Sequence, residues 1–291
     1  MGALRKNLFA SLFGVVLSAS VFAETLYQEN FDNGILPINN FSILDSKASL
    51  GISVDKFLNL NGSSGSIKGN YPAPYGTGGY YIWAGHILEK RNLQELYIEF
   101  DAKMPGAKHG LKFLKIFSQN DGTSGYANTT FGLDYTGVDY GGMYFVGFGD
   151  GTSKENDTQN VILFTGQYPQ YIGRSYGKAT VLTPQKKNWS SSNWGTSWHH
   201  FKFHIKFNSG TTSATQINDG EYYVEIDGVV YVNAKGLFNR HYLNKPIDRV
   251  EFFGWSQSGS KAFEIWYDNI RITTDGFANK PDAPANAKII N

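Results

Sequence analysis

Residues 198–207 of this chain read Trp-His-His-Phe-Lys-Phe-His-Ile-Lys-Phe, and residues 221–232 read Glu-Tyr-Tyr-Val-Glu-Ile-Asp-Gly-Val-Val-Tyr-Val. In the first stretch, apolar residues alternate with Lys and His. A period of two places the two sets on opposite faces of a β-strand. In the second stretch, Asp227 and Gly228 form the two-residue signal of a tight hairpin. Together the two stretches predict an antiparallel sheet with one apolar face and one basic, polar face.

Short strands of the same style recur along the chain. Further strands are predicted at 25–31, 41–45, 58–60, 80–83, 96–104, 111–117, 128–135, 143–148, 161–164, 249–255 and 262–272. Residues 61–79 are rich in Gly, Ser, Pro and Tyr and are predicted as a long loop. Short antiparallel strands separated by turns indicate an all-β fold. We therefore predict a two-sheet antiparallel β-sandwich of the jelly-roll type.

The last predicted strand changes its alternation part of the way along. Phe263, Ile265 and Tyr267 share one parity, whereas Ile270 and Ile272 have the other. A one-residue bulge at Asp268-Asn269 would keep both apolar sets on the core side, because a shift of one residue reverses the face of every later side chain.

The first 23 residues have the features of a secretory signal. Arg5 and Lys6 precede an apolar run at 8–22, and Val21-Phe22-Ala23 resembles a cleavage site. The run is shorter than the roughly 20 residues that cross a bilayer, although a retained anchor is the alternative. We predict one domain over 24–275 and a disordered tail over 276–291.

Composition fits an exported β protein. Aromatic residues make up 15% of the chain, which favours strands, and there is no cysteine, so the core must hold the fold without disulfides. A domain of this length can bury a core large enough for that. We expect a secreted or periplasmic protein that has no membrane contact after its signal is cleaved.

Four strand ends resemble a known family. They are Glu29-Asn-Phe-Asp-Asn-Gly, Tyr97-Ile-Glu-Phe-Asp-Ala-Lys, Glu251-Phe-Phe-Gly-Trp and Trp266-Tyr-Asp-Asn-Ile-Arg-Ile. With the hairpin above, they resemble the concanavalin A-like lectin/glucanase jelly roll, and their order resembles polysaccharide lyases of the alginate and glucuronan type. The resemblance covers most of 24–274. It implies two stacked sheets with polysaccharide bound across the concave one, but fold alone does not assign function.

Paired carboxylates offer one possible chemistry, glycoside hydrolysis, which needs two of them about 5–10 Å apart. Glycosidases of this fold carry a Glu-x-Asp-x-x-Glu or Glu-x-Asp-x-Glu strand. Glu99-Phe-Asp101 supplies the first two acids, but Lys103 and Met104 occupy the places of the third. Glu225-Ile-Asp227 runs into the hairpin turn. Neither match is complete, and a solvated strand face is the alternative reading of both.

Charge is distributed unevenly along the chain. The whole chain has a formal charge of +1, yet residues 158–218 contain no Asp or Glu. This basic window holds Arg174, Lys178, Lys186, Lys187, Lys202 and Lys206, with His199, His200 and His204. Basic groups among aromatic rings suit an acidic polysaccharide or a nucleic acid. Export favours the polysaccharide, while acids elsewhere in the fold that balance the window are the alternative.

Cleavage of a uronate by β-elimination needs a cation or amide at the carboxylate, a base for the C5 proton and an acid for the leaving oxygen. Tyr, His and Lys can fill these roles. The predicted catalytic residues are Lys112, His109, Tyr144 and Arg174. The predicted substrate-binding residues are Asn128, Thr130, Asp134, Tyr140, Tyr176 and Lys178. His200, Lys202 and His204 share one face, and the alternation does not decide whether that face lines the cleft.

Oxygen ligands near the paired chain ends suggest a structural Ca²⁺ site. Glu29, Asp32 and Asp268 belong to the first and last strands, which pair in the resembled fold. Capping or turn roles for these acids are the alternative. The histidines do not form a zinc pattern, and we expect no organic cofactor.

We therefore expect an exported protein that binds an acidic, uronate-containing polysaccharide, and not nucleic acid, and cleaves it by β-elimination. Whether it is an enzyme stays open. A non-catalytic, lectin-like carbohydrate-binding module is the first alternative, and a hydrolase of neutral glycans is the second.

Overall fold

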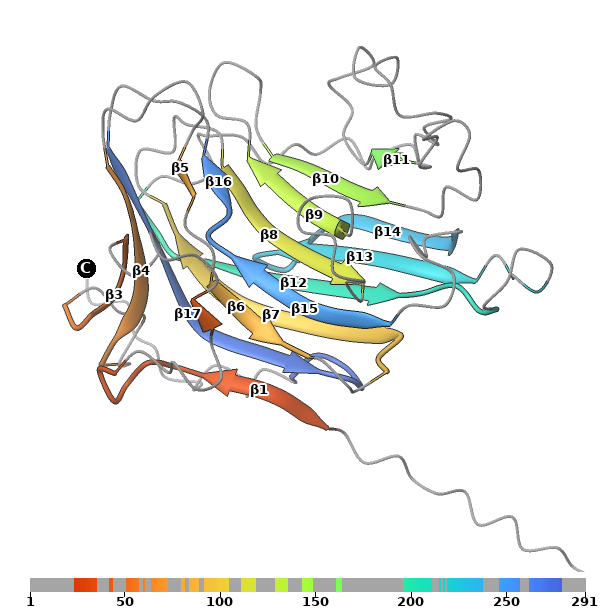
Figure 1. Cartoon of the computed structure of the whole chain (residues 1–291), viewed down its shortest axis with the longest axis horizontal. Coiled ribbons are helices and arrows are strands. Elements are labelled where there is room, and N and C mark those ends of the chain that lie inside the picture. Colours follow the sequence, from red (N-terminus) through yellow and green to blue (C-terminus); the bar gives the residue numbers. More distant parts are fainter. Residues whose placement is uncertain are drawn as a thin grey trace, which may run out of the picture.

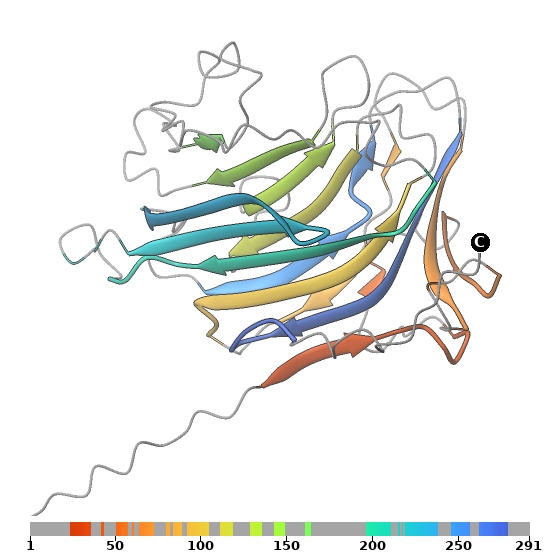
Figure 2. The same cartoon turned by 180° about the vertical axis from the view of Figure 1, so that it is seen from behind.

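The structure is a computed structural model, and its two antiparallel sheets stack as two layers (Figures 1 and 2). It describes residues 24–35, 42–43, 51–57, 60, 64–72, 80–81, 84–88, 92–104, 111–118, 129–135, 143–148, 161–163, 196–210, 215, 217, 219–237, 246–256 and 262–278. The all-β sandwich predicted from the sequence is confirmed. No helix in these residues has both the length and the apolar character that a membrane crossing requires.

Sheet A contains the two stretches that alternate most clearly. Its strands follow the order β14 (Val229–Leu237), β13 (Gly220–Ile226), β12 (His199–Lys206), β7 (Glu95–Lys103), β17 (Phe263–Thr273), β4 (Ser66–Tyr71) and β3 (Ile52–Asp55). The first strand, β1 (Thr25–Glu29), pairs with the second half of β17. The first and last strands thus pair, as the resembled fold implies.

Sheet B is formed largely by strands from the middle of the chain. Its order is β11 (Val161–Leu163), β10 (Met143–Phe148), β9 (Thr129–Tyr135), β8 (Leu111–Ser118), β15 (Ile247–Phe252), β6 (Ala84–Ile87) and β2 (Ser42–Ile43). The short strand β16 (Trp255–Ser256) pairs with β5 (Tyr80–Tyr81) and with β8. The strand β8 lies between two neighbours, as its largely apolar sequence predicts.

The core lies between the sheets and is rich in phenylalanine. Phe100 of β7 stacks on Phe201 of β12, with ring centroids 5.2 Å apart, and meets Phe252 of β15 edge-on at 5.3 Å. Burial of one such side chain contributes about 1.5–3 kcal/mol. The Tyr267 hydroxyl of sheet A also donates to the Phe113 carbonyl of sheet B at 2.9 Å. Apolar burial and buried hydrogen bonds therefore join the two layers.

Two local predictions are confirmed. Asp227 and Gly228 have φ values of 52° and 77°, the left-handed geometry of a tight hairpin turn between β13 and β14. The pairing of β17 with β7 shifts register between Asp268 and Arg271, and Asn269 has φ 49°. This bulge keeps Tyr267 and Ile270 both buried, with no exposed surface.

The loop predicted over 61–79 is wrong in part, because Ser66–Tyr71 forms β4 between β17 and β3. The sequence of β4 is Ser-Ile-Lys-Gly-Asn-Tyr, whose low apolar content hides its strand character. The glycine has a packing role. A Cβ atom on Gly69 would lie 2.5 Å from Cδ1 of the Phe253 ring.

Candidate functional site

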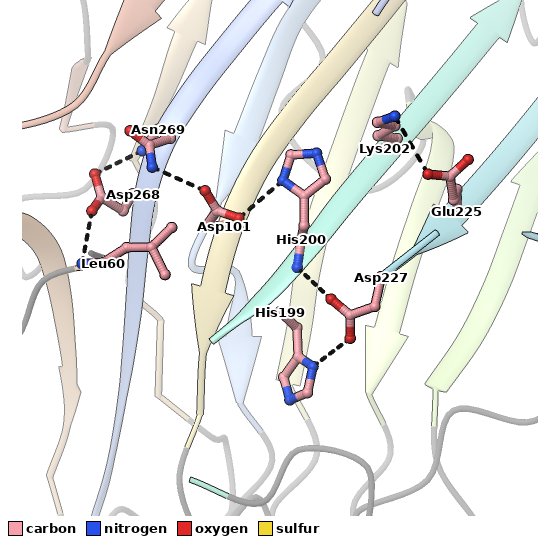
Figure 3. A network of polar contacts seen from close by, with 9 residues as sticks. All are labelled: Leu60, Asp101, His199, His200, Lys202, Glu225, Asp227, Asp268 and Asn269. Atoms are coloured by element: carbon pink, nitrogen blue, oxygen red, sulfur yellow. Dashed lines mark hydrogen bonds and ion pairs between the residues drawn. The ribbon is translucent and has the colours of Figure 1, made fainter. Parts of the chain in front are cut away.

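The outer face of sheet A carries a network of paired charges (Figure 3). Nδ1 of the His200 ring lies within hydrogen-bond distance of one Asp101 oxygen, at 2.9 Å, and the second oxygen of Asp101 accepts from the Asn269 side chain at 3.0 Å. His199 pairs with Asp227 at 2.7 Å. In the described residues the Nε2 atom of His200 is buried and has no hydrogen-bond partner.

Two further basic residues of β12, Lys202 and His204, also contact acids of neighbouring strands. Lys202 lies 3.4 Å from Glu225, and His204 lies 2.7 Å from Glu95. The acids come from β7 and β13, which flank β12 on either side. In this part of the basic window, the charge is therefore balanced within the fold. Residues 164–195 of the window lie outside the described residues.

The segment that follows β17 also covers part of this face. The Ala278 amide donates to Glu99 at 2.6 Å, and Lys202 lies 5.5 Å from the centre of the Phe277 ring. Burial, with help from Glu95, raises the pKa of Tyr97 to about 12. A phenol with that pKa stays protonated at neutral pH and is a poor base. The outer face of sheet A thus has paired charges and a covering segment. Packing here continues three residues past the predicted domain end, and 279–291 lie outside the described residues.

The face of sheet B that points away from the core, called here its second face, carries a different set of charges. Along β15, Val250 and Phe252 enter the core, so the alternate residues Arg249 and Glu251 project from the opposite face. Arg249 lies over the ring of Phe117, with 4.2 Å from its guanidinium carbon to the ring centre. Lys115 of β8 is the direct cross-strand partner of Glu251. Both charged residues are buried, with exposed fractions of 5% and 3%.

The Glu251 carboxyl is held in an unfavourable environment for a charge. Burial raises its pKa from 4.5 to about 7; Arg249 and Lys115 lower it and Asp248 raises it, but burial has the largest effect. Its Oε1 lies 3.0 Å from Nε of Arg249. The charges attract at that distance, yet neither atom has an aligned hydrogen bond within the described residues. Buried groups that are incompletely satisfied and have shifted pKa values are typical of functional sites.

Glycines flank this charged cluster, which consists of Lys115, Phe117, Arg249 and Glu251. Gly85 of β6 is the cross-strand partner of Glu251, and Gly132 of β9 is the partner of Lys115. A Cβ atom on Gly85 would meet the Val250 carbonyl, so no larger residue fits there without a shift. The row that contains the Glu251–Lys115 pair therefore has no side chain at either neighbouring position.

Three of the residues predicted from the sequence share one row of sheet B. Asp134 of β9 is paired in register with Lys112 of β8 on one side and with Tyr144 of β10 on the other. Along β9, Asp134 lies two residues from Gly132, the partner of Lys115, with the Leu114–Leu133 pair between the two rows. Thr130 also lies in β9. The backbone thus brings together positions that are up to 32 residues apart in the sequence, from Lys112 to Tyr144.

The other predicted site residues are not placed by the structure. His109, Asn128, Tyr140, Arg174, Tyr176 and Lys178 lie outside the described residues. In contrast, sequence reasoning missed Lys115, Arg249 and Glu251. The available signal was the position of these charges inside strands that also supply core residues such as Ile116 and Val250.

The three acids proposed for Ca²⁺ are described, and each accepts local hydrogen bonds. Glu29 accepts from the Phe31 amide at 2.8 Å, Asp32 accepts from the Ser64 amide, and Asp268 accepts from the Asn269 amide at 2.7 Å. These bonds fit turn roles. Within the described residues, no group of three or more His, Cys, Asp or Glu side chains is arranged to hold a metal ion. The calcium site stays a prediction.

Comparison with known proteins places this fold. No family model matches the chain, and no curated protein matches its sequence. Among solved structures, it is similar to the endo-β-1,4-glucuronan lyase of the fungus Trichoderma reesei, with TM-score 0.58, 13% identity, and coverage of 86% of this chain and 96% of that one.

Two alginate lyases are also similar in structure. For the PL-14 enzyme of Aplysia kurodai the TM-score is 0.56 at 13% identity, with 87% of this chain and 100% of that chain covered. For vAL-1 of a Chlorella virus the TM-score is 0.53 at 13% identity, with 86% and 100% covered. The resemblance to jelly-roll polysaccharide lyases is confirmed, and at this identity it establishes the shared fold alone.

Proposed function

We propose that this chain is an exported polysaccharide lyase that binds a uronate-containing polysaccharide on the second face of sheet B and cleaves it by β-elimination. One observation carries the proposal. A buried cation, Lys115, and a partly buried one, Arg249, lie on a sheet face away from the core, in a fold shared with glucuronan and alginate lyases. Buried charges are costly and are seldom kept without a partner or a role.

The chemistry assigns different tasks to the cluster and to the neighbouring row. A cation against the uronate carboxylate disperses the charge that develops when the C5 proton leaves, so that proton becomes more acidic. Lys115 and Arg249 suit this task. The base and the acid must come from groups that exchange protons, and Lys112 and Tyr144, in one row with Asp134, are the candidates there. His109 and Arg174 remain further candidates for these roles.

The substrate-binding residues of the proposal are Asn128, Thr130, Asp134, Tyr140, Tyr176 and Lys178. Of these, Thr130 and Asp134 belong to β9. A Ca²⁺ ion held by Glu29, Asp32 and Asp268 would support the fold and not the reaction. Secretion follows, in this proposal, from the signal-like residues 1–23 and suits a polymeric substrate outside the cell.

Incubation with a panel of alginate, glucuronan and other uronates tests the proposal. β-Elimination leaves an unsaturated sugar at each new end, so ultraviolet absorbance should rise as the polymer is cut. Retained binding without any rise across the panel would instead identify a lectin-like module. Release of reducing sugar without the absorbance would identify a hydrolase, and either outcome would overturn the lyase proposal.

A further inference from the structure

We propose that Glu251 exchanges its ion pair for a proton when an anionic carboxylate binds against Arg249 and Lys115, so that the charged cluster couples ligand binding to proton uptake. The inference rests on the proposed function for the identity of the ligand, a uronate carboxylate. It adds a role for a residue that β-elimination itself does not require.

The geometry of the Arg249 guanidinium favours such an exchange. Its central carbon lies 4.2 Å from the centre of the Phe117 ring, and its Nε lies 3.0 Å from Glu251 without an aligned hydrogen bond. A guanidinium binds a carboxylate best through two parallel bonds, and this contact does not provide them. An incoming carboxylate can therefore make a better pair with Arg249 than Glu251 does.

The charge balance of the cluster explains where the proton goes. Lys115 faces Glu251 from β8, Arg249 and Asp248 act on it from β15, and Gly85 of β6 contributes no charge. A second carboxylate in this buried space would repel an ionised Glu251. The exchange is balanced when one proton from solvent joins Glu251 as one ligand carboxylate takes its place. The net charge of the cluster then stays constant.

The starting state of Glu251 makes the exchange accessible near neutral pH. Burial already raises the pKa of this carboxyl to about 7, so its protonation there needs little free energy. The flanking Gly85 and Gly132 leave the neighbouring positions of the row without side chains. A carboxylate that binds at the pair would therefore meet no side chain from these two positions.

Calorimetric titration of the full chain with alginate and glucuronan oligosaccharides tests the inference. Measured at pH 8 in buffers of different ionisation enthalpy, wild type should take up close to one proton per bound ligand. Above pH 7, its Kd should rise by about tenfold per pH unit, as linkage to one proton requires. Glu251→Gln should take up no proton at this site, and its Kd should change little with pH.

Glu225→Gln is the matched control, because Glu225 is also a strand glutamate paired with a lysine, but on sheet A. This variant should keep the wild-type proton uptake. Equal proton uptake by wild type and Glu251→Gln would overturn the inference. A second check uses wild type alone, so it does not depend on the folding of a variant. The carbon-13 resonances of labelled Glu side chains should show one carboxyl whose pKa rises when ligand binds. Absence of this rise would also overturn the inference.

The two proposals fail in different ways. Unsaturated products formed by an enzyme that takes up no proton on binding would overturn the role of Glu251 and leave the lyase. Proton-linked binding without unsaturated products would overturn the lyase and leave the role of Glu251.

Discussion

Glu251 is the residue at which burial, charge and position conflict most clearly. Its side chain is 3% exposed, its strand neighbours on either side enter the core, and its nearest charged partner is imperfectly aligned. Replacing such a pair with apolar residues often stabilises a protein, so the pair is poor as a stabilising device. Its retention fits a functional role better than a structural one.

The stability of the protein should depend on pH through this residue. The folded-state pKa of about 7 exceeds the ordinary 4.5, so the folded state binds the proton more tightly. Ionisation of the buried Glu251 lowers the free energy of unfolding. This loss of stability is absent below pH 4.5, where the carboxyl is protonated in both the folded and the unfolded protein, and it is complete above pH 7. It should reach about 3 kcal/mol. Urea unfolding should show Glu251→Gln gaining stability over wild type by up to that amount as pH rises across this window. Parallel curves would contradict this account.

Gly69 should tolerate no side chain. A Cβ atom there would lie 2.5 Å from the Phe253 ring, which also packs edge-on against Tyr267 at 4.6 Å. Overpacking of a dense core costs about 1–3 kcal/mol, so Gly69→Ala should lower the free energy of unfolding by about that amount. The double variant Gly69→Ala with Phe253→Leu should recover part of the loss. An unchanged midpoint of chemical unfolding for Gly69→Ala would show that the ring moves aside freely.

At the residue scale, the sequence predicted part of the candidate site. Lys112 was predicted as a catalytic residue and Asp134 as a substrate-binding residue, and both lie in one row. Lys115, Arg249 and Glu251 were missed, because their meeting depends on the pairing of β8 with β15. That pairing joins segments more than a hundred residues apart, and no local alternation encodes it.

At the scale of single elements, turn chemistry and alternation were reliable. The Asp227-Gly228 hairpin and the bulge in β17 both follow from steric and periodic rules. The strand β4 escaped prediction because its role depends on a partner, the Phe253 ring, that its own sequence does not reveal. Elements specified by their own residues were predicted, and elements specified by contacts were not.

The bulge in β17 gives a prediction at this scale. Asn269 has φ 49° and donates to Asp101, which in turn contacts His200. Asn tolerates this left-handed conformation, while Ala costs roughly 1–2 kcal/mol there. Asn269→Ala should therefore lower the free energy of unfolding by more than Asn269→Gly, which loses the hydrogen bond but not the backbone freedom. Equal losses in urea unfolding would mean that the backbone strain is not decisive.

At the scale of the whole molecule, the two outer faces differ. On sheet A, Lys202 and His204 of β12 form ion pairs with acids of neighbouring strands, and the segment that contains Phe277 covers part of the face. On sheet B, buried charges lie beside glycines and beside the row of Lys112, Asp134 and Tyr144. His200, Lys202 and His204 lie on the face opposite the proposed site.

The central claim is that the charged cluster on sheet B serves polysaccharide cleavage. Its most direct test is the ultraviolet absorbance of unsaturated ends, followed for wild type, Arg249→Ala and the sheet A control Lys202→Ala. Wild type and Lys202→Ala should cleave a uronate polymer at similar rates. Arg249→Ala should lose about 10²–10³-fold, the usual cost of removing one charge-stabilising group. Equal rates for the two variants, or no absorbance from wild type on any uronate, would contradict the account.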